Sequence, residues 1–200
     1  VGTNEWINAE NIRTGSTDKG VTGVVESVGG NAELPQPPSA KAFFFNSDFS
    51  NIGTYQLGTT QSTSSLIGFG EITNSVGIDF VTDIGEPNTD TIEDGYWNIY
   101  CNLSNFGSTT TPNIYAEIYT YSIGGVLTLI STTDKVSVPN TSFEVCYNLK
   151  AYIPQQTILD TDRIYIKFIG ENITGTGAYI AFYLQSNLSN NWSSYILTNL

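Results

Sequence analysis

Two aspartates, Asp160 and Asp162, are the residues best placed for chemistry, because they stand one residue apart in the segment Leu159-Asp-Thr-Asp-Arg163. Carboxylates at this spacing could hold a Ca²⁺ ion together, or act as a general acid and a general base. The same spacing also suits a turn, in which aspartate side chains accept hydrogen bonds from the nearby backbone and Arg163 pairs locally. We favour the turn and predict that both aspartates are structural, with Ca²⁺ binding as the alternative.

Histidine is absent from all 200 residues, and only two cysteines are present. This composition excludes a Ser/His/Asp or Cys/His nucleophile pair within the chain, and also an ordinary zinc or iron site. Paired carboxylates, a lysine nucleophile or carboxylate-bound Ca²⁺ remain possible. A glycoside hydrolase would need two acids about 5 to 9.5 Å apart in a cleft, and no such pair is indicated. We therefore expect no enzymatic activity and no cofactor.

A second group of acidic residues lies between residues 83 and 94. It lacks the ligand spacing and the central glycine of an EF-hand loop. A solvated loop is the simpler interpretation. The group consists of Asp83, Glu86, Asp90, Glu93 and Asp94.

Five tyrosines are expected on the outward faces of two consecutive strands: Tyr96, Tyr100, Tyr115, Tyr119 and Tyr121. Tyrosine offers apolar area with a polar end, which suits a subunit interface or the packing of a second sheet. Stacked tyrosine rings could also contact a glycan, or simply be exposed. If the faces are assigned in reverse, the rings would instead belong to the core. We favour the interface.

The elements that must position these residues are β-strands. In residues 95–104, Trp97, Ile99 and Leu103 alternate with polar residues and tyrosines, which is the period of a strand with one buried face. Similar alternation recurs to the end of the chain without any helical period, and it predicts an all-β domain of two packed antiparallel sheets. We expect one core to contain Trp97, Ile99, Leu103, Ile114, Ile118, Phe143, Val145, Ile164, Ile166, Phe168, Ile180 and Phe182.

The two cysteines fall on different faces in this pattern. Cys101 lies on the inward face of its strand, whereas Cys146 lies on the face opposite Phe143, Val145 and Tyr147. We favour two free thiols, although the strand pairing that would allow a disulfide is not fixed by the sequence.

Seven basic and nineteen acidic residues give the chain a net charge of -12. Such a surface repels phosphate backbones and anionic lipids, so nucleic acid and membrane surfaces are poor partners. No apolar run is long enough to cross a bilayer, and we expect no membrane insertion.

Residues 1–40 differ in composition from the rest. They are rich in glycine, asparagine and threonine, and they end in a segment containing Pro35, Pro37 and Pro38, which favours an extended linker. We predict an N-terminal arm over residues 1–40 that docks on a neighbouring chain, followed by a folded domain over residues 41–200.

The order of segments after residue 41 resembles the jelly-roll head domains of virion-surface proteins from tailed phages and large DNA viruses. The resemblance rests on Phe43-Phe-Phe45, Gly95-Tyr-Trp-Asn-Ile-Tyr100, Tyr115-Ala-Glu-Ile-Tyr119, the segment from Leu159 to Lys167, and Ala178-Tyr-Ile-Ala-Phe-Tyr-Leu184. Relatives often carry a histidine in their last polar segment, where this chain has Trp192-Ser-Ser-Tyr195. No role that depends on that histidine is carried over.

The resemblance implies a jelly-roll sandwich in a fibre, spike or capsid-decorating protein at the virion surface, without catalytic residues. It also implies a homotrimer whose residues 1–40 contact other virion proteins, and possible attachment to a host glycan or receptor. The alternative is a carbohydrate-binding module or lectin-like domain of an extracellular protein. A trimer would support the virion protein, and a monomer with an aromatic-lined groove would support the lectin.

Overall fold

The computed structural model describes residues 40–50, 52–60, 70–140, 143–184 and 193–200, and the predicted arm over residues 1–40 lies almost wholly outside them. Within these residues there is no helix, so none is long and apolar enough to cross a membrane. The all-β prediction is confirmed. The strands are β1 (Lys41–Phe49), β2 (Tyr55–Gly58), β3 (Gly70–Ile72), β4 (Ile78–Thr82), β5 (Thr91–Ile92), β6 (Gly95–Phe106), β7 (Asn113–Tyr121), β8 (Leu127–Thr132), β9 (Val136–Ser137), β10 (Val145–Ile153), β11 (Gln156–Thr157), β12 (Arg163–Glu171), β13 (Tyr179–Tyr183) and β14 (Tyr195–Thr198).

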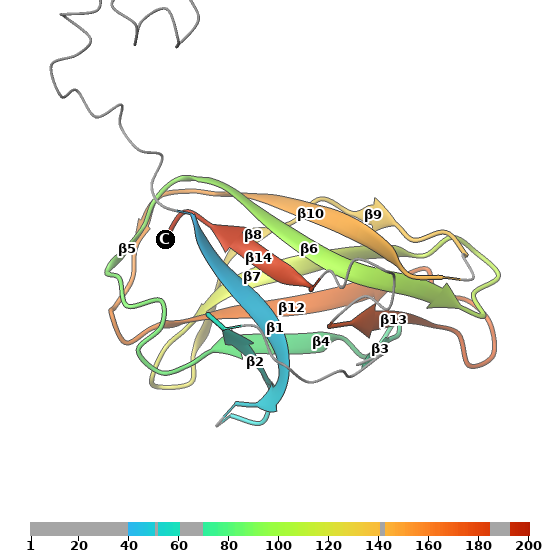
Figure 1. Cartoon of the computed structure of the whole chain (residues 1–200), viewed down its shortest axis with the longest axis horizontal. Coiled ribbons are helices and arrows are strands. Elements are labelled where there is room, and N and C mark those ends of the chain that lie inside the picture. Colours follow the sequence, from blue (N-terminus) through green and yellow to red (C-terminus); the bar gives the residue numbers. More distant parts are fainter. Residues whose placement is uncertain (1–39, 51, 61–69, 141–142, 185–192) are drawn as a thin grey trace, which may run out of the picture. The chain divides into compact units, whose positions relative to one another are not determined.

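Twelve of the strands join in one large sheet (Figure 1), with the order β3-β13-β6-β14-β1-β2-β4-β12-β7-β8. Strand β10 adds to β6, β9 adds to β7, and β5 with β11 forms a separate small sheet. All pairings are antiparallel except that of β2 with β4, which is parallel. The expectation of two purely antiparallel sheets is therefore corrected to one large mixed sheet.

Side chains from both halves of this sheet meet in a single core, so the sheet curves round its own buried face. At its centre Phe45 of β1 packs edge-to-face on Phe80 of β4 at 4.7 Å and on Phe168 of β12 at 5.3 Å between ring centroids. Phe182 of β13 lies 4.8 Å from Phe168. Aromatic pairs at these distances add to the free energy gained by burial alone.

The predicted core set is confirmed for ten of its twelve members. The two exceptions stand at the start of β10. Phe143 precedes the strand and is 63% exposed, and Val145 is only half-buried. Strand β10 pairs with β6 alone, and its inward side chains become fully covered only from Leu149 onward.

Strand β14 is last in chain order but central in the sheet, between β6 and β1. Ser194, just before it, is fully buried; its hydroxyl donates to the Tyr183 carbonyl at 2.6 Å and accepts from the Asn102 backbone NH at 3.0 Å. A polar side chain is thus stabilised in the core because its hydrogen bonds are satisfied.

Candidate functional site

The outer surface of β4, β12 and β7 carries a set of neighbouring polar side chains. Cross-strand register places Lys167 between Asp79 and Glu117, and Tyr165 beside Tyr119. Side chains alternate along each strand, so Ile166, between Tyr165 and Lys167, points into the core together with its partners on β4 and β7.

Two tyrosines on this surface lie beside carboxylates. The Tyr119 hydroxyl donates to Glu117 at 2.5 Å, and the Tyr165 hydroxyl faces Asp79. Partial burial, followed by the bonded carboxylate, raises the pKa of Tyr119 to about 12. The same causes, in the same order, raise the pKa of Tyr165 above its ordinary value. Both phenols are therefore donors, not nucleophiles, at neutral pH.

An ion pair borders this network at one end. Lys135 Nζ lies 2.7 Å from Glu171 and 5.0 Å from the centre of the Tyr115 ring. Desolvation and then the nearby carboxylates of Glu171 and Glu117 raise the pKa of Tyr115. Because Lys135 is half exposed, this pair contributes little to stability.

A buried arginine closes the other end. Arg163 is 3% exposed, donates from Nε to the Thr82 carbonyl at 2.5 Å, and lies 5.9 Å from the Tyr121 ring centre. Desolvation lowers its pKa from the ordinary value. From the sequence we expected Arg163 to pair locally, near the two aspartates. In the structure its side chain bonds to Thr82 at the junction of β4 and β12.

A pocket of about 270 Å³ opens beside this surface, between β2, β3 and β4. Its lining includes Tyr55 and two carboxylates, Glu71 and Asp79. One oxygen of Asp79, Oδ1, is buried and has no hydrogen-bond partner among the residues that the structure describes. Gly77 in the wall leaves no room for a side chain, since a Cβ there would stand 2.3 Å from the Phe168 carbonyl oxygen.

Sequence reasoning missed the pocket. Its residues come from three strands that do not alternate strongly, and their proximity depends on the parallel pairing of β2 with β4. The carboxylates of Glu71 and Asp79 are eight positions apart, which gives no recognisable motif.

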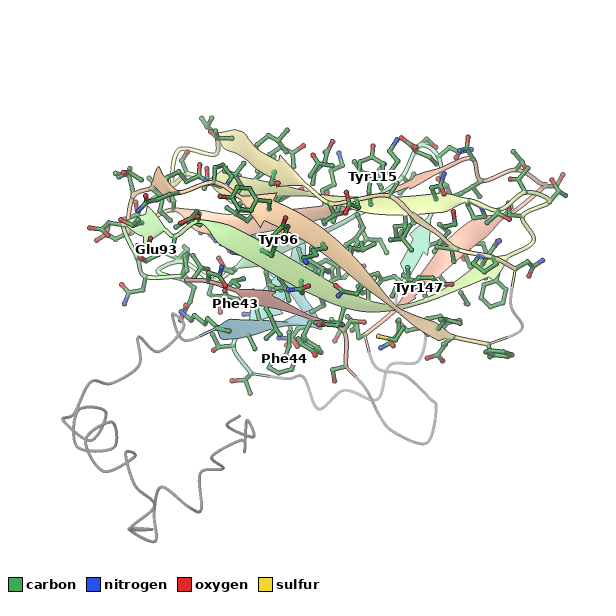
Figure 2. All side chains as sticks on the ribbon, turned by 90° about the horizontal axis from the view of Figure 1, so that it is seen from above. Phe43, Phe44, Glu93, Tyr96, Tyr115 and Tyr147 are labelled. Atoms are coloured by element: carbon green, nitrogen blue, oxygen red, sulfur yellow. The ribbon has the colours of Figure 1, made fainter. Side chains whose placement is uncertain are left out.

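The five predicted tyrosines all point outward but form two groups. Tyr96 and Tyr100 on β6 contact Tyr152 at 5.4 Å and Tyr195 at 4.9 Å, respectively. Tyr115, Tyr119 and Tyr121 on β7 contact residues of β12 and Lys135 instead. Figure 2 shows Tyr96 and Tyr115 on these different strands. A role of either group as an interface or a glycan contact stays a prediction.

The two aspartates of the first hypothesis lie in a turn. The Asp162 carboxylate accepts from the Leu159 NH at 3.1 Å, and the Asp162 NH donates to the Leu159 carbonyl at 2.8 Å. Asp160 is exposed. No group of three or more His, Cys, Asp or Glu residues suited to a metal ion occurs in the described part of the chain.

The acidic loop contacts segments that are distant in the sequence. Glu86 pairs with Lys41 at 2.6 Å, Asp83 accepts from Gln56 at 2.6 Å, and Asp94 accepts from Tyr152 at 3.2 Å. The two cysteines are free, Cys101 buried and Cys146 exposed. The alternation therefore placed both thiols on the correct faces.

No protein-family profile and no curated protein matches this chain in sequence. Solved structures do share the fold. An alpha-amino acid ester hydrolase superposes with a TM-score of 0.54 at 14% identity, over 80% of this chain and 36% of that one. An aminopeptidase from a marine sediment archaeon, Thaumarchaeota archaeon, gives 0.57 at 10% identity, over 79% and 36%. A CocE/NonD family hydrolase from Staphylococcus aureus gives 0.55 at 8% identity, over 82% and 37%.

The structural neighbours are similar in fold alone, and this chain spans a little over a third of their length. These three are nevertheless all hydrolases, which corrects five expectations. The resemblance to virion jelly-roll heads is wrong, and with it the virion structural function and the virion-surface location. The lectin alternative and the expectation of a non-enzyme are overturned by the same finding.

Proposed function

We propose that this chain is the β-domain of a hydrolase that cleaves ester or amide bonds. The observation that carries the proposal is the shared fold: hydrolases of three descriptions contain it over about four fifths of this chain. Describing that fold as a jelly-roll sandwich belongs to the same proposal, supported by the single core and the mainly antiparallel pairing.

The proposal assigns the catalytic base and the binding of substrate to different parts of the protein. A nucleophile activated by an imidazole needs a histidine, and this chain has none. Any such base therefore belongs to residues outside this sequence, and the β-domain contributes binding and shape. The outer side of β4, β12 and β7 supports this role: its polar side chains, Asp79, Tyr165, Lys167, Glu117 and Tyr119, form a tyrosine–carboxylate surface, and the Tyr119 phenol fixes the position of the Glu117 carboxylate.

The pocket of Tyr55, Glu71 and Asp79 is the part of the chain suited to contact substrate. Two of the similar hydrolases are named for substrates with an amino group, an alpha-amino acid ester and the amino end of a peptide. Glu71 is exposed and makes no ion pair in the described residues. Its carboxylate is therefore open to a substrate ammonium group.

The test isolates the protein that carries this chain from its source cells with antibodies raised against the purified chain. The isolate is assayed with p-nitrophenyl esters and p-nitroanilides of amino acids, each with a free or an acetylated amino group. We expect hydrolysis that is removed by immunodepletion and is faster for the free amino group. An isolate that hydrolyses none of these substrates would refute the proposal.

A pair of variants separates the pocket from the general role. Glu71→Gln is expected to raise KM for free-amino substrates by about tenfold, the effect of losing about 1.4 kcal/mol of binding, with kcat unchanged. The matched control is Glu93→Gln in the acidic loop, where Glu93 accepts only from Gln155. An equal effect of both variants would place the amino-group contact elsewhere and leave hydrolase activity itself unaffected.

A further inference from the structure

Strand β8 stands at the end of the large sheet and pairs on one side with β7. On the other side it approaches β10 only at its end, where Ser131 Oγ donates to the Tyr152 carbonyl at 2.8 Å and the Asp134 NH donates to the Lys150 carbonyl at 3.0 Å. No strand among the described residues pairs with the outer edge of residues 127–129. An unpaired edge is a template for another strand.

The side chains of this free edge are apolar and exposed. Leu127 is 43% exposed and Leu129 is 53% exposed. Their partners on β7 are Tyr121 and Tyr119, so both leucines continue the outward side of the tyrosine–carboxylate surface. The register shift between Ile118 and Tyr119 limits the regular edge to the first residues of β8.

Charge is missing from this region. No Asp, Glu, Lys or Arg occurs in residues 118–133, in a chain whose net charge is -12. Edge strands that must stay unpaired usually carry a lysine, a proline or an inward charge, and β8 has none of these. Acidic copies of one chain repel each other, so an uncharged strand is where two copies can approach at least electrostatic cost.

We infer that β8 is a self-association edge, at which a second copy of this chain pairs antiparallel with the first across a two-fold axis. Centred on Thr128, the pairing sets Thr128 opposite its own copy and Leu127 opposite Leu129 of that copy. Leu127 and Leu129 share one side of the strand, so four leucines meet on one face. A two-fold interface needs a surface that complements itself, and this sequence meets that condition.

The register can be tested by engineered disulfides in a Cys146→Ser background, which removes the exposed native thiol. Paired Cα atoms in an antiparallel ladder are about 4.5 to 5.5 Å apart, within disulfide range. Thr128→Cys should therefore form a covalent dimer with oxidised glutathione. The matched control is Thr132→Cys, also exposed on β8, whose two copies would be about 26 Å apart at roughly 3.3 Å per residue.

Sedimentation of the full chain completes the test. Wild type should be a dimer that dissociates on dilution, and Leu129→Lys should raise the dimer Kd at least about tenfold, whereas Val76→Lys, an exposed apolar position away from β8, should not. The inference is overturned by a wild type that stays monomeric at about 100 μM, by a trimer, by a dimer insensitive to Leu129→Lys, or by equal cross-linking at positions 128 and 132.

Discussion

The hydroxyl of Tyr119 connects packing to pH. Its pKa is raised to about 12, above an ordinary value of 10, by partial burial and by the hydrogen bond to Glu117. The folded state therefore holds this proton more tightly than the unfolded state. The resulting stability is fully present below pH 10 and is lost as pH rises toward 12.

Urea unfolding at a series of alkaline pH values measures this effect. We expect the unfolding free energy of wild type to fall between pH 10 and 12, and Tyr119→Phe to show a shallower fall. Below pH 9 the variant should differ from wild type only by the lost hydrogen bond, a difference of about 1 kcal/mol. Parallel curves for the two proteins above pH 10 would contradict the assignment.

The two thiols should differ in reactivity. Burial is the main cause that raises the pKa of Cys101 well above its ordinary value, and its side chain is fully covered, whereas Cys146 is exposed. Because the thiolate is the reactive form, a thiol reagent such as Ellman's should label one cysteine in the native chain at pH 8 and two in denaturant. Loss of the native signal in Cys146→Ser is the control, and two rapid labels without denaturant would show that the core opens.

The sequence predicted well which face of a strand a residue occupies. It did not predict which distant residue lies beside it. Alternation placed Cys101 inward and Tyr119 outward, as the structure has them. Arg163 bonds to Thr82, which lies 81 positions earlier in the chain, and Asp79 lies beside Tyr165, which comes 86 positions later. No local pattern encodes such a pairing.

At the scale of one strand, Trp97 and Phe143 provide a matched comparison. Both were expected in the core, but Trp97 within β6 is fully buried and Phe143 before β10 is 63% exposed. Trp97 is the third residue of β6. We expect Trp97→Ala to lower the unfolding free energy by about 3 to 5 kcal/mol, and Phe143→Ala to lower it by less than about 1 kcal/mol. Chemical denaturation measures both, and a large loss from Phe143→Ala would show that this residue is covered in solution.

Strand existence was predictable because a half-buried strand imposes a period of two on its sequence. Strand neighbours were not, because most contacts join residues far apart in the chain. The parallel pairing of β2 with β4 is the clearest example. It sets Tyr55 opposite Phe80, next to Asp79, whereas Glu71 is placed by the pairing of β3 with β13, so the pocket was missed together with the topology.

At the scale of the whole molecule, the order of alternating strands proved less specific than it seemed. Aromatic strands such as Gly95-Tyr-Trp-Asn-Ile-Tyr100 arise wherever a sheet has one buried and one wet face. The same order therefore fits folds with unrelated functions, and it was wrongly assigned to virion proteins. The absence of histidine excludes an imidazole base within this chain. It does not exclude that the chain forms part of an enzyme.

The boundary near residue 40 also belongs to this scale. The described core begins at Phe43, and Lys41 already pairs with Thr198. We expect a chain of residues 41–200 to unfold within about 2 °C of the full chain, since less than about 1 kcal/mol would be lost. Scanning calorimetry of the two proteins decides; a fall of about 8 °C or more would show that residues 1–40 stabilise the domain.

The central place of β14 has a consequence for the order of events during synthesis. Until residues 195–198 have left the ribosome, the slot between β6 and β1 is empty and both strands present open edges. Folding must therefore wait for β14, the last of the described strands, and nascent chains should stay protease-sensitive at every earlier stalling point. Pulse proteolysis of chains stalled with β14 inside and then outside the exit tunnel should reveal one abrupt gain of resistance, and gradual gain would mean that the sheet closes without its central strand.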